Sequence, residues 1–196
     1  HDIECILEGE KHFLETENSV QVMAMYLPIY LKLEPDEIYR GPYLKPSEEY
    51  INKWKKLLPE GKLLGVKWQG TPAYDQQLHR DIPFEKIDSL KWDGTKVNLQ
   101  LEKELYKEGY FNAGEHIESL EDTLALLSLL DNTVTSCTSI IHMIGSIGAK
   151  GIVCPPIACY YVWLGDTKWY GDNVTVIRQK KHKNWNETFD KVKQLI

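Results

Sequence analysis

The chain has 196 residues, 42% hydrophobic and 27% charged, with a formal net charge of −6. These values are typical of a globular protein with one domain, or one domain and part of another, and the acidic balance argues against nucleic acid as a partner. No apolar run approaches the roughly 18 residues of a membrane span, and no signal peptide is present, so we expect a cytoplasmic protein without a transmembrane segment. The four cysteines show no paired ligand spacing, which predicts reduced thiols and no metal site.

The first 60 residues form an irregular region with several prolines. Within it, Ser47 followed by two glutamates predicts a helix that runs to about residue 58, because serine caps helices and acids favour their first turn. We interpret residues 1–60 as a partial N-terminal lobe and linker, too short for a complete Rossmann-like lobe. We interpret the start at His1 in two ways: as the start of a fragment, which a longer N-terminal lobe or a repeat domain would precede, or as the remnant of a tag.

From residue 61 onward, short apolar runs alternate with amphipathic segments. This alternation predicts an α/β domain over residues 61–196, with a Rossmann-like, doubly wound parallel sheet and helices on both faces. Ligands of such sheets bind at the carboxyl ends of the strands. The expected strands are 62–68, 95–101, 109–112, 133–136, 151–154 and 174–178, and the expected helices are 83–90, 119–130, 138–147 and 184–196.

Polar and turn-forming residues follow the first expected strand. Gly70 and Pro72 predict a tight turn, either a plain βα connection or a loop over the ligand edge. Arg80 offers a planar fork of donors that suits a phosphate, but the spacing alone favours a surface ion pair with Asp75 or Asp81.

The segment from Ser136 to Ser139 predicts the start of a helix directly after a strand. The first amides of such a helix, together with the hydroxyls of Thr138 and Ser139, favour a diphosphate. Ordinary N-capping explains the same hydroxyl residues equally well. His142, one turn into the helix, is interpreted as a packing residue or as a ligand contact. Cys137 is a candidate nucleophile because thiol pKa values fall at helix N-termini, but no histidine partner is assigned to it.

Several short segments of the chain match the heptosyltransferase-like glycosyltransferases in their order and spacing. The chain resembles especially the bacterial group associated with tetratricopeptide repeats. The segment GVKWQGTP is similar to the family's G-L-V-W-S-G-N-P, and TSIIH is similar to its T-S-V-A-H. The matching segments are 27–28 with 42–44, 65–72, 80–83, 98–100, 121–126 with 130–131, 138–142, 169–170 and 177–179.

The resemblance implies the C-terminal donor-binding lobe of an inverting, GT-B-type glycosyltransferase. Its substrate would be a nucleotide-diphosphate sugar with no further cofactor, and its acceptor a glycan, lipid or protein. By this resemblance, Thr138, Ser139 and His142 would lie near the diphosphate, and Trp68, Gly70 and Thr71 would line the cleft. Leu99, Gln100, Asp122 and Thr123 would lie toward the base and ribose.

The chain also departs from the family pattern. Cys137 stands where the family has an aspartate, and Tyr74 where a histidine is common. The family takes its general base from the first lobe, and the sequence does not choose among the acids there. These acids are Glu15, Glu17, Glu34, Asp36 and Glu37. A non-catalytic or degenerate nucleotide-binding module of the same fold is therefore the alternative function.

Overall fold

The computed structural model describes residues 26–34, 41–70, 77–159, 161–164 and 170–196. The chain divides into two compact units, His1–Tyr39 and Arg40–Ile196, which are treated separately here. In the first unit, the described residues form one turn of helix, α1 (Leu27–Tyr30), with a proline in its first turn.

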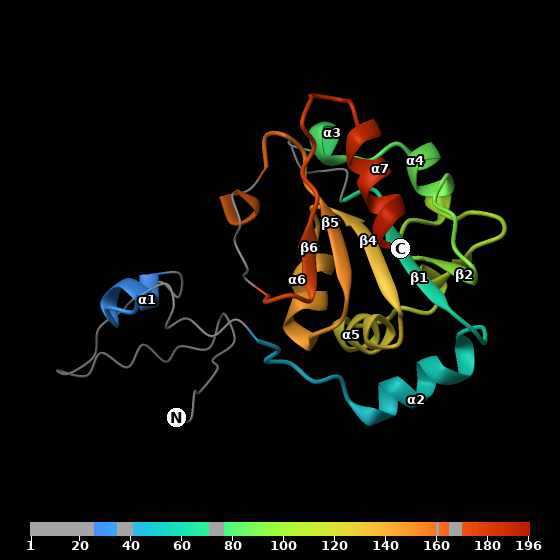
Figure 1. The fold of residues 1–196 in the computed structure, drawn as a ribbon. Coiled ribbons are helices and arrows are strands. Elements are labelled where there is room, and N and C mark those ends of the chain that lie inside the picture. Colours follow the sequence, from blue (N-terminus) through green and yellow to red (C-terminus); the bar gives the residue numbers. More distant parts are fainter. Residues whose placement is uncertain (1–25, 35–40, 71–76, 160, 165–169) are drawn as a thin grey trace. The chain divides into compact units, whose positions relative to one another are not determined.

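The second unit is built on one sheet of six strands. They are β1 (Leu63–Lys67), β2 (Thr95–Asn98), β3 (Phe111–Asn112), β4 (Asn132–Ser136), β5 (Gly151–Cys154) and β6 (Val174–Val176). All strand pairs are parallel, and the strand order is β3-β2-β1-β4-β5-β6 (Figure 1). The predicted parallel α/β sheet is therefore confirmed. Strands β1, β2, β3 and β6 are shorter than expected, β5 has the expected bounds, and β4 begins one residue earlier.

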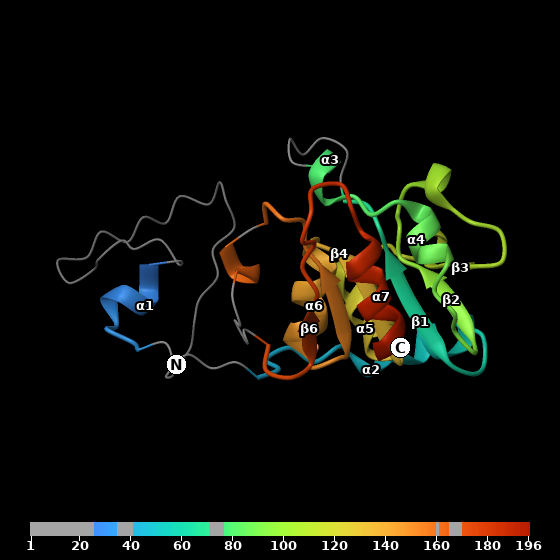
Figure 2. The ribbon, with the colours of Figure 1, turned by 45° about the horizontal axis from the view of Figure 1, so that its top comes forward.

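Helices cover both faces of this sheet. They are α2 (Glu48–Leu57), α3 (Gln77–Arg80), α4 (Phe84–Asp88), α5 (Leu120–Ser128), α6 (Ser139–Ile147) and α7 (Asn186–Leu195), with short 3-10 turns η2 (Lys103–Leu105), η3 (Ala113–Glu115) and η4 (Tyr161–Trp163). Helices α4 and α7 pack on one face and α2, α5 and α6 on the other (Figures 1 and 2).

The period-two alternation of β1 separates the two layers of the core. Leu63 joins the cluster under α2, α5 and α6, whereas Leu64 and Val66 join the cluster under α4 and α7. A central strand whose two faces are both buried needs apolar side chains on both, which explains the apolar sequence of this segment. The largest fully buried side chains include Trp54, Trp68, Trp163 and Phe189.

Local signals explain where the helices start and stop. The Ser47 side chain accepts a hydrogen bond from the Tyr50 backbone N–H, and the Ser119 side chain accepts one from the Asp122 N–H at 3.1 Å. The helix-start signals predicted at both serines are therefore confirmed. Helix α6 ends at Gly148, whose φ of 73° is in the left-handed region that favours glycine.

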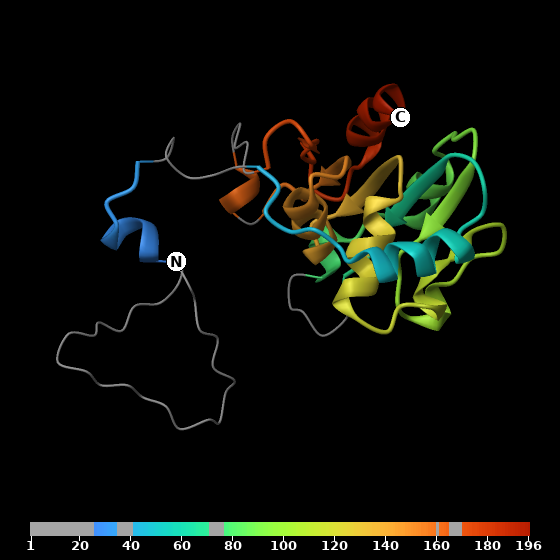
Figure 3. The same ribbon diagram turned by 90° about the horizontal axis from the view of Figure 1, so that it is seen from below.

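Helix α2 belongs to the same compact unit as the sheet. It lies beside α5 (Figure 3), and the Lys53 ammonium and the Trp54 indole N–H both donate to Asp122 Oδ1, at 2.7 and 3.1 Å. The compact unit therefore begins at Arg40, ahead of the boundary after residue 60 that the sequence suggested. The composition shift near residue 60 marks the turn into β1 instead.

Candidate functional site

The strand order places a topological switch point between β1 and β4. The chain moves from β1 toward β2 and β3 on one side, and from β4 toward β5 and β6 on the other. Crevices at such points, outside the carboxyl ends of the strands, are where open parallel sheets bind ligands. The loops after β1 and β4 meet at this edge, with α3 over it at the top of Figure 1.

The first turn of α6 lies at this switch point without a side-chain cap. Thr138 occupies the N-cap position with extended backbone, but its side chain makes no cap hydrogen bond, and the first turn contains no acidic residue. The Thr138 hydroxyl instead lies 3.2 Å from the Thr135 hydroxyl. Ser139, next in the chain, is exposed. The structure therefore does not support the interpretation of Thr138 as an ordinary side-chain cap of α6.

The Arg80 guanidinium joins the two loops at the switch point. Its Nη1 donates to the Cys137 carbonyl oxygen at 3.2 Å, just ahead of α6. A Cβ added at Gly70 would lie 2.1 Å from Arg80 Nη2, so the guanidinium packs directly over this glycine. Glycine at position 70 thus allows a cation to lie beside an uncapped helix N-terminus. The site combines two sources of positive potential.

The Cys137 thiol at this edge is not activated. Burial raises the pKa of Cys137 by more than the nearby Trp163 indole and the Arg80 cation lower it. A raised pKa keeps the thiol protonated at neutral pH, where nucleophilic catalysis requires the thiolate. The alternative of a thiol enzyme therefore receives no support.

His142 lies one turn into α6 and packs against aromatic side chains. Its Nδ1 lies 2.8 Å from the Tyr170 hydroxyl, and its ring contacts Trp163 with centroids 5.3 Å apart. Burial lowers the pKa of His142. These contacts correspond to the packing interpretation of this histidine.

Replacing Gly145 by alanine is expected to disrupt this packing. The new Cβ would lie 2.1 Å from Cγ of Tyr170, so the ring must move and release His142. We expect a loss of about 1–3 kcal/mol in the free energy of unfolding, although alanine normally favours a helix. The pKa of His142 should rise toward its ordinary value, measured by NMR titration of the ring proton.

The sign of the pH dependence follows from that pKa. Because the folded protein holds His142 with a lowered pKa, the unfolded chain binds more protons, and stability falls as pH drops below about 6.5. The Gly145→Ala variant should show less of this loss. Ser139→Ala, an exposed change in the same helix, serves as the control. An unchanged His142 titration in Gly145→Ala would contradict the expectation.

Two residues at the ends of β1 and β2 form a further polar contact. The Gln100 side-chain oxygen accepts from the Gln69 backbone N–H at 3.3 Å, so this amide lies across the end of β1. Lys67, which the sequence interpretation did not select, donates from Nζ to the Leu99 carbonyl oxygen at 3.1 Å. A lysine in the otherwise apolar run KLLGVKW was the signal that could have identified it.

Three expected ligand contacts are instead part of the protein interior. Trp68 is 1% exposed and packs against Phe84, with ring centroids 5.0 Å apart, so it does not line an open cleft. Asp122 is 1% exposed and already accepts hydrogen bonds from four groups, so its carboxylate is not available to a ribose. The Thr123 hydroxyl donates back to the Ser119 carbonyl oxygen. These expectations are corrected accordingly, and Thr71 lies outside the described residues.

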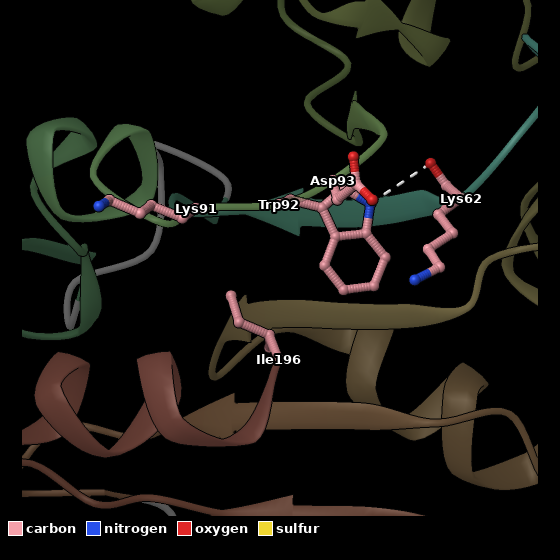
Figure 4. A pocket seen from close by; sticks show the side chains of 5 residues that line it. All are labelled: Lys62, Lys91, Trp92, Asp93 and Ile196. Atoms are coloured by element: carbon pink, nitrogen blue, oxygen red, sulfur yellow. Dashed lines mark hydrogen bonds between the residues drawn. The ribbon is translucent and has the colours of Figure 1, made fainter.

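A shallow hollow of about 500 Å³ lies at the opposite end of the sheet. Figure 4 shows its lining, in which the Trp92 indole N–H donates to the Lys62 carbonyl oxygen at 3.3 Å. Lys62 precedes β1 and Trp92 precedes β2, so the hollow is at the amino ends of the strands. It is therefore separate from the switch point. Its lining residues are Lys62, Lys91, Trp92, Asp93 and Ile196.

Within the described ranges, His, Cys, Asp and Glu side chains form no cluster of three or more that could hold a metal ion. The helices of that same part of the chain include none with the length and apolar character needed to cross a membrane. Of the acids considered as general bases, only Glu34 is described, and it is exposed in the first unit. No protein-family model, curated protein or solved structure matches this chain.

Proposed function

We propose that residues 61–196 are the donor-binding lobe of a heptosyltransferase-like, inverting glycosyltransferase of the GT-B type. The observation that carries this proposal is the uncapped N-terminus of α6 at the switch point of the sheet, with the Arg80 guanidinium beside it. Four backbone N–H groups at a helix start have no partner within the helix and attract anions. A diphosphate supplies both the charge and the acceptor oxygens for such a site.

The proposed chemistry is a direct displacement at the anomeric carbon of the donor sugar. The acceptor oxygen forms the new glycosidic bond as the bond to the diphosphate breaks, and the electron pair leaves with the diphosphate. The α6 amides and Arg80 stabilise the negative charge that develops on the leaving group. The acceptor hydroxyl proton passes to a base of the first lobe, which the described residues do not identify.

A non-catalytic nucleotide-binding module of the same fold is the second candidate. The observation that favours it is Cys137, which stands where the resembling family has an aspartate. Since burial keeps this thiol protonated, the position carries no negative charge at neutral pH. Cys137 therefore cannot take over a catalytic role that requires a carboxylate at this position. The α6 amides would still hold a diphosphate.

Calorimetric titration with UDP, GDP, ADP, dTDP and inorganic pyrophosphate tests the shared part of both candidates. We expect a dissociation constant in the micromolar range for at least one nucleoside diphosphate. Absence of binding to all five compounds would overturn the proposal. Incubation with the matching nucleotide sugar then separates the candidates, because release of the nucleoside diphosphate requires catalysis. In Cys137→Asp, turnover gained with unchanged binding would indicate a degenerate enzyme.

A further inference from the structure

The hollow at the amino ends of the strands is built around the backbone of Lys62. The Lys62 carbonyl oxygen accepts two hydrogen bonds, from the Thr95 N–H at 2.8 Å and from the Trp92 indole N–H at 3.3 Å. A Cβ added at Gly94 would lie 2.2 Å from that oxygen, so a residue larger than glycine does not fit there. The backbone therefore holds the Trp92 ring in place before any partner arrives, which lowers the entropic cost of binding.

The Trp92 ring offers apolar surface that the fold leaves partly uncovered. It packs against the core cluster under α4 and α7, but the residue as a whole is only partly buried. Ile196, also partly buried, lines the same hollow (Figure 4). Covering exposed aromatic and aliphatic surface is favourable, because it removes that surface from water. These two residues therefore suit an apolar side chain that comes from outside the chain.

The rest of the lining is charged, with an excess of positive charge. Lys62 and Lys91 contribute two ammonium groups and Asp93 contributes one carboxylate, and all three residues are exposed. Figure 4 shows the two lysines at opposite ends of the lining. Within the described ranges, none of these three side chains takes part in an ion pair. One positive charge is therefore left over, on a chain whose formal net charge is −6.

The shape of the hollow favours a protein over a small molecule. Pockets for small molecules are concave and cover most of the surface of their ligand. This hollow is shallow, and three of its five lining residues are exposed. The centres of protein interfaces, in contrast, are enriched in tryptophan, and polar and charged residues surround them. The lining of the hollow has this arrangement.

We propose that the hollow docks an acidic segment of a partner protein that carries one apolar anchor side chain. The anchor packs on Trp92 and Ile196, and carboxylates on either side of it approach Lys62 and Lys91. Charge complementarity selects this partner, since the two lysines attract acidic groups and repel basic ones. Asp93 repels a carboxylate that approaches in the wrong register, which fixes the orientation of the segment. The inference does not depend on the proposed donor-binding function, because the hollow lies at the other end of the sheet.

An anionic bilayer is a poorer match for the same charges. One lysine near an anionic membrane surface strengthens binding by only about fivefold. Interfacial binding of a helix requires a continuous apolar face together with several basic residues. Two lysines and one indole ring do not supply these, so we expect no binding to anionic vesicles through this hollow.

The test follows the Trp92 indole N–H resonance by NMR in the full chain labelled with ¹⁵N. The resonance is assigned by its absence in Trp92→Phe. The probes are the acetylated and amidated peptides EEFEE and EELEE, with EEAEE lacking the anchor and KKFKK lacking the acids. Vesicles of phosphatidylglycerol and inorganic pyrophosphate test the bilayer and small anions in general.

We expect EEFEE or EELEE to shift the Trp92 resonance with a dissociation constant below about 1 mM at low salt, and the affinity should fall as salt is added. EEAEE and KKFKK should bind at least about fivefold more weakly, because each lacks one half of the recognition. Pyrophosphate and the vesicles should leave the resonance in place.

Charge reversal in the hollow is compared with charge reversal elsewhere. The double variant Lys62→Glu/Lys91→Glu should bind EEFEE about tenfold more weakly or worse, since two attractions become repulsions. Lys55→Glu/Lys103→Glu changes the net charge equally at exposed lysines outside the lining, and it should bind within about twofold of the wild type. Asp93→Asn removes the one like charge and should strengthen binding about twofold to threefold.

The indole resonances of the buried Trp54, Trp68 and Trp185 report whether each variant stays folded. The docking site is wrong if neither EEFEE nor EELEE shifts the Trp92 resonance, if EEAEE binds as well as they do, or if both double variants behave alike. A shift caused by vesicles or pyrophosphate would assign the hollow to a bilayer or a small anion and would also overturn it. Should the reversal in the hollow unfold the chain, Asp93→Asn decides, because unchanged or weaker binding there contradicts the proposal.

Discussion

Replacing Asp122 by alanine is expected to lower the free energy of unfolding by about 3 kcal/mol. Its carboxylate accepts from Lys53 Nζ at 2.7 Å, from the Trp54 indole N–H at 3.1 Å, and from Glu118 N and Ser119 Oγ. The change leaves the fully buried Trp54 indole N–H without its acceptor and removes the connection between α2 and α5. Urea denaturation followed by tryptophan fluorescence measures the loss.

Glu118→Gln is the matched control for this prediction. Glu118 is the second carboxylate near Lys53, at 3.6 Å, but its side chain is 85% exposed. Exposed ion pairs contribute at most about 1 kcal/mol, so this variant should unfold almost as the wild type does. Similar losses in Asp122→Ala and Glu118→Gln would show that the buried hydrogen bonds are not what stabilises the contact between α2 and α5.

The lowered pKa of Asp122 also predicts how the free energy of unfolding changes with pH. Burial alone would raise its pKa, but the hydrogen bonds from Lys53, Glu118 and Ser119 lower the pKa below the ordinary value. The unfolded chain therefore takes up a proton first. The contribution is complete above the unfolded pKa of about 3.9, and it is lost as pH falls through the lower folded pKa. Asp122→Ala should show a smaller loss of stability in that range.

The second large effect concerns ligand binding. Ser139→Asp is expected to weaken diphosphate binding about 100-fold and to stabilise the fold slightly. Ser139 is the exposed first residue of α6, so a carboxylate there meets the positive end of the helix. Acids in a first turn stabilise a helix by about 0.5 kcal/mol. Like charges about 4 Å apart near a protein surface repel by about 4 kcal/mol before screening by salt.

The opposite signs of these two effects make the experiment decisive. A variant that loses affinity because it is misfolded would also lose stability, whereas this one should gain it. Ser139→Asn has nearly the same size without the charge, and it should bind a diphosphate within a fewfold of the wild type. Unaltered pyrophosphate and nucleoside diphosphate binding by Ser139→Asp would mean that ligands do not bind at the α6 N-terminus.

Some site residues were misassigned although the sequence contained the necessary signal. Leu64, Val66 and Trp68 stand at every second position of the apolar run that predicted the first strand, and all three pack in the core layer under α4 and α7. The alternation within that run therefore indicated that Trp68 is a core residue. Lys67 follows the other alternation and reaches the end of β2. The motif resemblance implies that Trp68 lines a ligand cleft, whereas the alternation of side chains along the strand places it in the core, where it is 1% exposed.

The hydrogen-bond partners of Asp122 show which contacts a local sequence pattern cannot predict. The helix start predicted at Ser119 is confirmed, since a cap depends only on residues three apart in the chain. The Trp54 partner lies 68 residues away, and no local period or spacing records that α2 packs on α5. The one-turn helix α3 was missed for a related reason, because four residues are too few to show a helical period.

The alternation of apolar runs and amphipathic segments was enough to predict a parallel α/β sheet. Central strands of such a sheet are buried on both faces and need apolar residues, whereas the helices that cover the sheet need only one apolar face. Tertiary structure alone decided which polar residues meet at the carboxyl edge: Arg80 against Cys137, Gln100 over the end of β1, and Asp122 turned inward to α2. These contacts join segments far apart in the chain, and the strand order that brings them together depends on the packing of the whole sheet.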